Sequence, residues 1–180
     1  MSGIDTAVWI TGLAVGVTCL VVGALASRAP IRRMVARGHG IVAFELARTP
    51  GRAARIRRDW GVEGRAAART SLFADVPFLV GYGLLLATLA GWPSDRVGEI
   101  AGAGAGTVSR WMAGIALAAA ALDLIEDVAL LLQLRHGDAL DGGRATAPVA
   151  WACASLKFAG IADVLAWSLC FVLPAWITAG

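Results

Sequence analysis

The 180-residue sequence has few charged and few reactive side chains. Charged residues make up only 16% of it and hydrophobic residues 58%, whereas a water-soluble domain is about one quarter charged. It contains one tyrosine, two histidines and three cysteines, and no HExxH, CxxC, Ser-x-x-Lys or Gly-rich phosphate-loop motif. This composition excludes a soluble enzyme, a disordered chain and a nucleic-acid-binding module, and the length predicts a single membrane domain over residues 1–180.

Four apolar runs in the sequence are long enough to cross a bilayer. A helical crossing takes about 20 residues, because an α-helix rises about 1.5 Å per residue. Gly12 and Gly16, in the first run, have the spacing that lets two membrane helices pack closely. We therefore predict an all-α integral membrane protein, a four-transmembrane-helix bundle whose spans cover residues 8–27, 72–92, 110–134 and 148–177.

Positive charge is concentrated between the first and second predicted spans. Residues 28–70 contain eleven of the sixteen Lys and Arg residues, opposed only by Glu45, Asp59 and Glu63. The positive-inside rule places this stretch in the cytoplasm. We therefore expect a multi-pass protein of the bacterial plasma (inner) membrane, with both termini outside and the 135–147 loop in the cytoplasm.

The Arg-rich stretch also contains apolar residues near helical spacing, such as Met34, Phe44, Ile56 and Trp60. This pattern predicts two or three short amphipathic helices lying on an anionic leaflet. We interpret the arginines first as a topology signal that anchors the segment to lipid headgroups. Alternatively, they hold an anionic headgroup or a pyrophosphate beside a functional site.

Three acidic residues lie inside the third predicted span. Asp123, Glu126 and Asp127 have i, i+3, i+4 spacing, so they share one helical face. A charge at the centre of a membrane helix costs about 2.5–3.5 kcal/mol on insertion scales, and such residues usually serve a function. We therefore predict that these three residues are catalytic.

The only lysine of the chain, Lys157, lies inside the fourth predicted span. It follows Pro148 by nine residues, about 14 Å along a helix, so we expect it to reach the depth of the acidic triplet. Lys157 is then either an electrostatic partner in catalysis or one half of a purely structural ion pair. Asp163 and Trp167, further along the same span, are predicted to contact substrate at the edge of the cavity.

The second predicted span opens with Asp75, two residues before Pro77. We interpret Asp75 first as the N-cap of that helix, with Pro77 in its first turn. Alternatively, Asp75 and Tyr82, which share a helical face, contact substrate in the same cavity as the acids. Glu45 either joins them from the Arg-rich segment or forms a salt bridge with an arginine such as Arg48.

Carboxylates that share one face of a buried helix do not all ionise at low cost. We expect at least one to stay protonated, which would provide a general acid next to an ionised base. A divalent cation would also hold the acids together, and oxygen ligands suit Mg²⁺ or Ca²⁺. The sequence leaves the cofactor open between Mg²⁺ and none.

Two short patterns link these polar residues. The second predicted span reads Asp-x-x-Phe-x-x-x-Tyr-Gly from Asp75, and the third reads Leu-Asp-x-x-Glu-Asp from Leu122. With Lys157 in the last span, the chain resembles small uncharacterised bacterial four-span membrane proteins. The resemblance covers about a third of the chain and implies no activity, but it favours a joint role for these residues.

Three functions fit these features. The first is a membrane enzyme that acts on a lipid or isoprenoid-type substrate by carboxylate acid–base chemistry near the cytoplasmic leaflet. The second is a proton- or cation-coupled carrier, expected as a homodimer because four spans enclose little volume. The third is a non-catalytic subunit or assembly factor whose charges only lock the bundle. The expected partner is a membrane lipid or another lipophilic small molecule, and not a nucleic acid.

Overall fold

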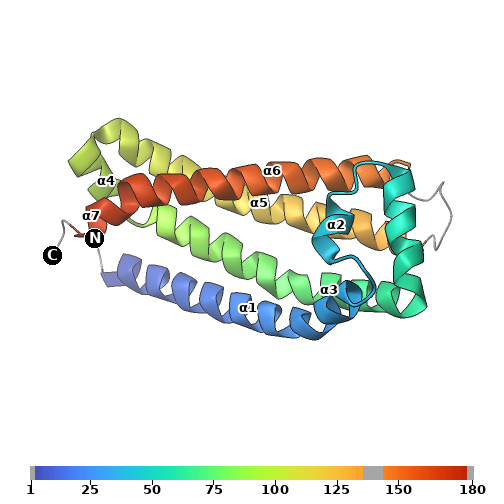
Figure 1. Cartoon of the computed structure of the whole chain (residues 1–180). Helices are drawn as coiled ribbons and strands as arrows, with labels where there is room; N and C mark the ends of the chain where they lie inside the picture. Colours follow the sequence, from blue (N-terminus) through green and yellow to red (C-terminus); the bar gives the residue numbers. More distant parts are fainter. Residues whose placement is uncertain (1–2, 136–143, 178–180) are drawn as a thin grey trace. The chain divides into compact units, whose positions relative to one another are not determined.

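The computed structural model describes residues 3–135 and 144–177 of the chain. All regular elements in these ranges are helical, which confirms the predicted all-α class. Both chain ends and residues 136–143 lie outside the described residues, and with them the predicted outer placement of the termini and most of the 135–147 loop. The helices in chain order (Figure 1) are α1 (Gly3–Val35), α2 (Ile41–Glu45), α3 (Pro50–Gly91), α4 (Ser94–Ala101), α5 (Ala103–Arg135), α6 (Thr146–Trp167), the π-helix η2 (Ser168–Val172) and α7 (Leu173–Ile177).

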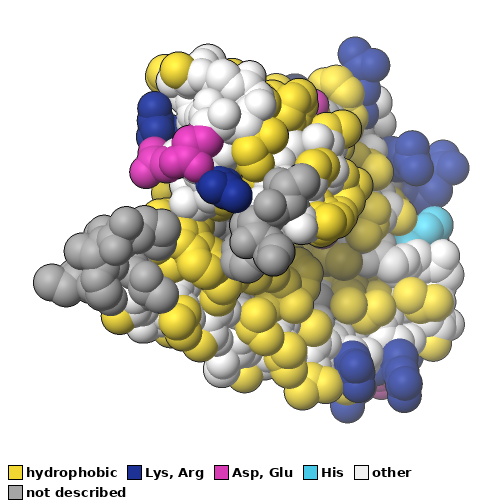
Figure 2. Space-filling view, turned by 90° about the vertical axis from the view of Figure 1, so that its left-hand side faces the viewer, with side chains coloured by type: hydrophobic (Ala, Val, Ile, Leu, Met, Phe, Trp, Pro, Cys, Tyr) yellow, Lys and Arg dark blue, Asp and Glu magenta, His cyan; other side chains and the backbone are white. Residues whose placement is uncertain are grey.

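Three stretches of helix are long and apolar enough to cross a membrane: Ala7–Val35, Pro50–Ala101 and Thr146–Ala175. They contain the first and second predicted spans and all but the last two residues of the fourth. The third predicted span, in α5, is not among them, so a total of four crossings stays a prediction. The face drawn in Figure 2 consists largely of hydrophobic and uncharged groups, and its charged side chains lie in separate patches.

The chain divides into two compact units. The first unit contains residues 1–20, 80–120 and 157–180, and the second contains residues 21–79 and 121–156. Each of the long helices α1, α3, α5 and α6 contributes residues to both units. The units are described separately below, and the single domain over residues 1–180 stays a prediction.

In the first unit, α1 and α3 approach each other closely at glycines. A Cβ atom added to Gly16 would lie 3.1 Å from the carbonyl oxygen of Gly81, and one added to Gly12 would lie 3.0 Å from Oγ1 of Thr88. Both distances are tighter than ordinary van der Waals contact. This confirms that Gly12 and Gly16 form the close-packing face that their spacing predicts.

Another part of the first unit contains α4, which occupies a region that the sequence leaves as a linker. Val97 of α4 is buried against Val172 and Ala175, at the end of the last helical stretch. Nearby, the Trp167 indole Nε1 donates a hydrogen bond of 2.9 Å to Oγ of Ser109. Trp167 is therefore held by a hydrogen bond within the protein. Tryptophan suits this position because its large apolar side chain carries a single hydrogen-bond donor.

The second unit has a core formed largely by the Arg-rich stretch. Met34, Phe44 and Trp60 are buried there with Leu130 and Ala150, and the Phe44 and Trp60 rings pack edge to face with centroids 5.1 Å apart. The predicted amphipathic pattern is thus present, and its apolar face packs on helices α5 and α6 of the same unit. The reason is that α2 and the start of α3 are too short to be stable without such packing.

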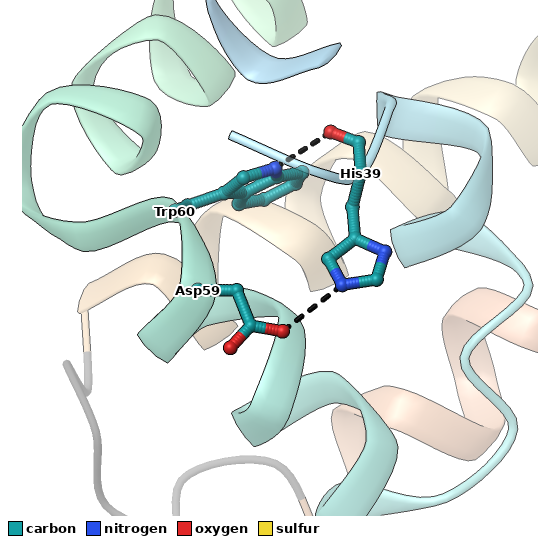
Figure 3. Close-up of polar contacts among 3 residues, drawn as sticks. All are labelled: His39, Asp59 and Trp60. Carbon is teal, nitrogen blue, oxygen red and sulfur yellow. Dashed lines mark hydrogen bonds and ion pairs between the residues drawn. The ribbon is translucent and has the colours of Figure 1, made fainter. Parts of the chain in front are cut away.

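A small polar network attaches the chain between α1 and α2 to the start of α3 (Figure 3). The Nε2 atom of His39 lies 3.0 Å from Oδ2 of Asp59, and Nε1 of Trp60 donates a hydrogen bond of 2.7 Å to the carbonyl oxygen of His39. Arg37 forms an ion pair with Glu63 in the same region. These contacts attach the turn between α1 and α2 to the start of α3.

Helix α3 bends at Gly61. This residue has φ 61° and ψ −162°, a conformation that essentially only glycine adopts. Residues 50–60 therefore run across the direction of the rest of α3 (Figure 1). The remainder, residues 62–91, is continuous through Pro77.

Candidate functional site

The acidic face of α5 points into the second unit. Asp123, Glu126 and Asp127 are only 3%, 0% and 4% exposed, as expected for residues on one helical face. The opposite face is apolar and open, since the following residues are each about half exposed: Leu124 at 47%, Ile125 at 51% and Val128 at 50%. An α-helix with acids inside and aliphatic residues outside suits a lipid solvent and not water.

Asp75 of α3 joins two of these acids. Carboxylate oxygens of Asp75, Asp123 and Asp127 all lie within 4.8 Å of one another. We call these three residues the carboxylate cluster. Glu126 lies outside this set although it is fully buried on the same helical face.

The N-cap interpretation of Asp75 is wrong. Asp75 lies 25 residues after the start of α3 at Pro50 and 14 residues after Gly61, so it sits in the helix interior. Helix α3 runs on through Pro77 because a proline removes only one internal hydrogen bond, a loss that packed helices tolerate. Asp75 and Pro77 have the spacing of a helix start, but residues 62–74 before them are also helical.

The spacing of the carboxylate cluster allows two kinds of chemistry. Carboxylates this close can work as an acid–base pair, in which one donates a proton and a neighbour accepts one. The same oxygens could hold a divalent cation such as Mg²⁺ or Ca²⁺, whose ligands are oxygens at short range. Either arrangement provides a group that changes protonation or charge in a buried, apolar setting.

The sequence analysis missed a buried arginine and a buried glutamine in the second unit. Arg57 is 0% exposed, and its Nη1 atom donates a long hydrogen bond of 3.5 Å to Oε1 of Gln133. Gln133 lies seven residues after Glu126, so it extends the acidic face of α5 by two turns. Its Nε2 atom is buried and has no hydrogen-bond partner within residues 3–135 and 144–177. Arg57 therefore supplies a buried cation in the same unit as the acids.

Helical spacing contains the signal that would have identified Arg57. It lies four residues after Ala53 and three before Trp60, and both of these are fully buried. It is thus a charge on the apolar face of the helix, whereas Arg55 and Arg58 lie on the exposed face. Taken only as a member of an arginine-rich run, it could not be distinguished from its exposed neighbours.

Other predicted site residues belong to the first unit. Lys157 and Tyr82 are buried there, and the Lys157 Nζ atom lies 5.1 Å from the centroid of the Phe158 ring. Trp167 is partly buried, whereas Asp163 is exposed. The shared role of Lys157 and Tyr82 with the acids stays a prediction.

Glu45, the remaining predicted substrate-binding residue, lies at the end of α2 in the second unit and is partly buried. Arg48, the arginine suggested as its partner, packs its guanidinium over the Trp151 ring, 4.9 Å from the centroid, and a salt bridge between Glu45 and an arginine stays a prediction. Comparison of the chain with protein-family models, curated proteins and solved structures gives no match.

Proposed function

We propose that this protein is an integral membrane enzyme that acts on a lipid or isoprenoid-type substrate by carboxylate acid–base chemistry, at a site reached from the cytoplasmic leaflet. The observation that carries the proposal is the carboxylate cluster, whose oxygens lie within 4.8 Å of one another. Retaining three carboxylates this close together within a bundle of helices is costly, and function is the usual reason for that cost.

The proposed roles follow from the environment of each group. Asp123 or Glu126 acts as the general acid, which donates a proton to a developing oxyanion or a double bond. Asp127 is its ionised partner and accepts the proton in return. Lys157 stabilises the negative charge that remains. Isomerisation, cyclisation and headgroup transfer are reactions that such an acid–base pair supports.

The test is to incubate the purified protein in detergent with a total bacterial lipid extract and to analyse the lipids by mass spectrometry. We expect one lipid class to decrease and a product to appear, and we expect Asp123→Asn and Glu126→Gln to lower the rate at least 100-fold. Asp95→Asn is the matched control, since Asp95 is exposed on α4. An unchanged lipid profile with the wild-type protein would overturn the proposal.

Lys157→Arg tests the lysine separately. A compact ammonium and a planar guanidinium are not interchangeable in a buried site, so we expect the arginine variant to lose most activity while keeping its abundance. A fully active Lys157→Arg variant would remove Lys157 from the mechanism and leave the acids in place.

A second candidate is a proton- or cation-coupled carrier. It is favoured by the same cluster, since three oxygens at this spacing could bind and release a proton or a cation during transport. It predicts flux into proteoliposomes that depends on pH or on the cation and is lost in Asp127→Asn. Such flux with no change in the lipids would select the carrier over the enzyme.

A further inference from the structure

The second unit contains a surface hollow between α1 and α3. Its volume is about 460 Å³. One wall comes from the end of α1 and the other from the part of α3 that follows Gly61. The lining residues are Pro30, Arg33, Glu63, Ala66, Ala67 and Thr70. We call this hollow the α1–α3 groove.

The charges in the groove leave one cation without a counter-ion. Glu63 is already engaged by Arg37 in an ion pair. Arg33 is exposed and makes no hydrogen bond or ion pair with any other residue that the structure describes. The Thr70 hydroxyl donates its only proton to the carbonyl oxygen of Ala66, at 3.1 Å, so it has no donor left for an anion. The Arg33 guanidinium is therefore the anion-binding group of the groove. This arrangement fits a phosphate oxyanion.

The groove lies where both helices change from charged to apolar sequence. In α1, residues 7–27 contain no charged residue, and the arginines begin at Arg28. In α3, arginines extend to Arg69, and Asp75 is the only charged residue of the sequence between residues 70 and 91. A boundary of this kind matches the headgroup level of a bilayer, where arginines interact with anionic lipid.

Exposed apolar side chains continue from the groove along both helices. Val22 of α1 lies eleven residues before Arg33, and Phe73 of α3 lies seven residues after Ala66, so each is on the side of its helix that lines the groove. Both side chains are exposed. A ligand with a negatively charged head and hydrocarbon tails would match both regions, whereas a soluble phosphate would match only the groove. We propose that the α1–α3 groove binds the phosphate of an anionic phospholipid, with the acyl chains along these apolar residues.

The proposal is tested by native mass spectrometry of the full-length protein in detergent with equimolar phosphatidylglycerol and phosphatidylcholine. We expect the wild type to retain phosphatidylglycerol in preference. Arg33→Gln should lower that retention about fivefold, the effect of one arginine at an anionic surface. Arg32→Gln is the matched control, since Arg32 is exposed on the same helix but does not line the groove.

Three results would overturn the proposal. The first is retention unaffected by Arg33→Gln, and the second is an equal loss in Arg32→Gln, which would indicate diffuse charge attraction. The third is full displacement of the lipid by equimolar glycerol phosphate, which would make the groove a site for soluble phosphate esters. Glu63→Gln adds a check of opposite sign, since it releases Arg37 and should increase retention. Helical content by circular dichroism shows whether each variant is folded.

Discussion

Arg69 of α3 donates a hydrogen bond from Nη2 to the carbonyl oxygen of Leu134, at 2.7 Å. This carbonyl is one of the last four of α5, which have no partner within their own helix. The arginine therefore caps α5 and ties it to α3, the two helices that supply the carboxylate cluster.

Replacing Arg69 should weaken this connection. We expect Arg69→Gln to lower the free energy of unfolding by about 1 kcal/mol, the usual net value of one hydrogen bond. Thermal denaturation in detergent, followed by circular dichroism, measures the change. Arg55→Gln is the control, because Arg55 is exposed on the same helix. Equal losses in both variants would contradict a capping role.

The buried Arg57 should matter much more than its neighbours. Removing one partner of a buried charged contact costs about 3 kcal/mol or more, since it leaves the remaining groups buried without compensation. We therefore expect Arg57→Met to lower the melting temperature strongly and Arg58→Met, at an exposed position, to change it little. Similar melting temperatures for the two variants would show that Arg57 is not a structural cation.

Removing one acid from the carboxylate cluster should affect the stability of the protein and its activity differently. Asp127→Asn keeps the size of the side chain and removes its charge, so we expect the free energy of unfolding to change by no more than about 1 kcal/mol. The same variant should lose the activity or flux described above. A larger loss of stability would mean that the three carboxylates are held by favourable contacts, such as a bound cation. Repeating the melt with added Mg²⁺ or Ca²⁺ tests that explanation.

Close helix packing in the first unit is tested at Gly81. A Cβ atom there would collide with the backbone of Leu20 and would lie 2.8 Å from the carbonyl oxygen of Gly16. We expect Gly81→Ala to cost about 2 kcal/mol through this overpacking. Gly114→Ala is the matched control, because a Cβ atom at Gly114 meets nothing within 4 Å. A destabilised control with an unaffected Gly81 variant would contradict the packing described here.

The sequence predicted those features that depend on periodicity. The inward face of α5 follows from i, i+3, i+4 spacing, and the close approach at Gly16 follows from residue size. Both are properties of a single helix, and a single helix is determined by its own sequence.

The features that were missed depend on contacts between helices. Asp75 looked like a helix start because Pro77 follows it, and only the packing of residues 62–74 as helix shows otherwise. Arg57 looked like its neighbours because charge alone does not reveal which residue of a run faces the core. In each case the local sequence pattern is present, but tertiary packing determines which structure it adopts.

The bend at Gly61 divides α3 into two helical segments, and each has its own rotation about its axis. A residue added or removed before Gly61 would not turn the later part of α3 about its axis. One residue added between Gly61 and Asp75 would rotate Asp75 by about 100° and carry its carboxylate away from Asp123 and Asp127. The spacing from this glycine to the aspartate is therefore fixed by the geometry of one helix, whereas the arginine-rich chain before it is held in place by its own core contacts.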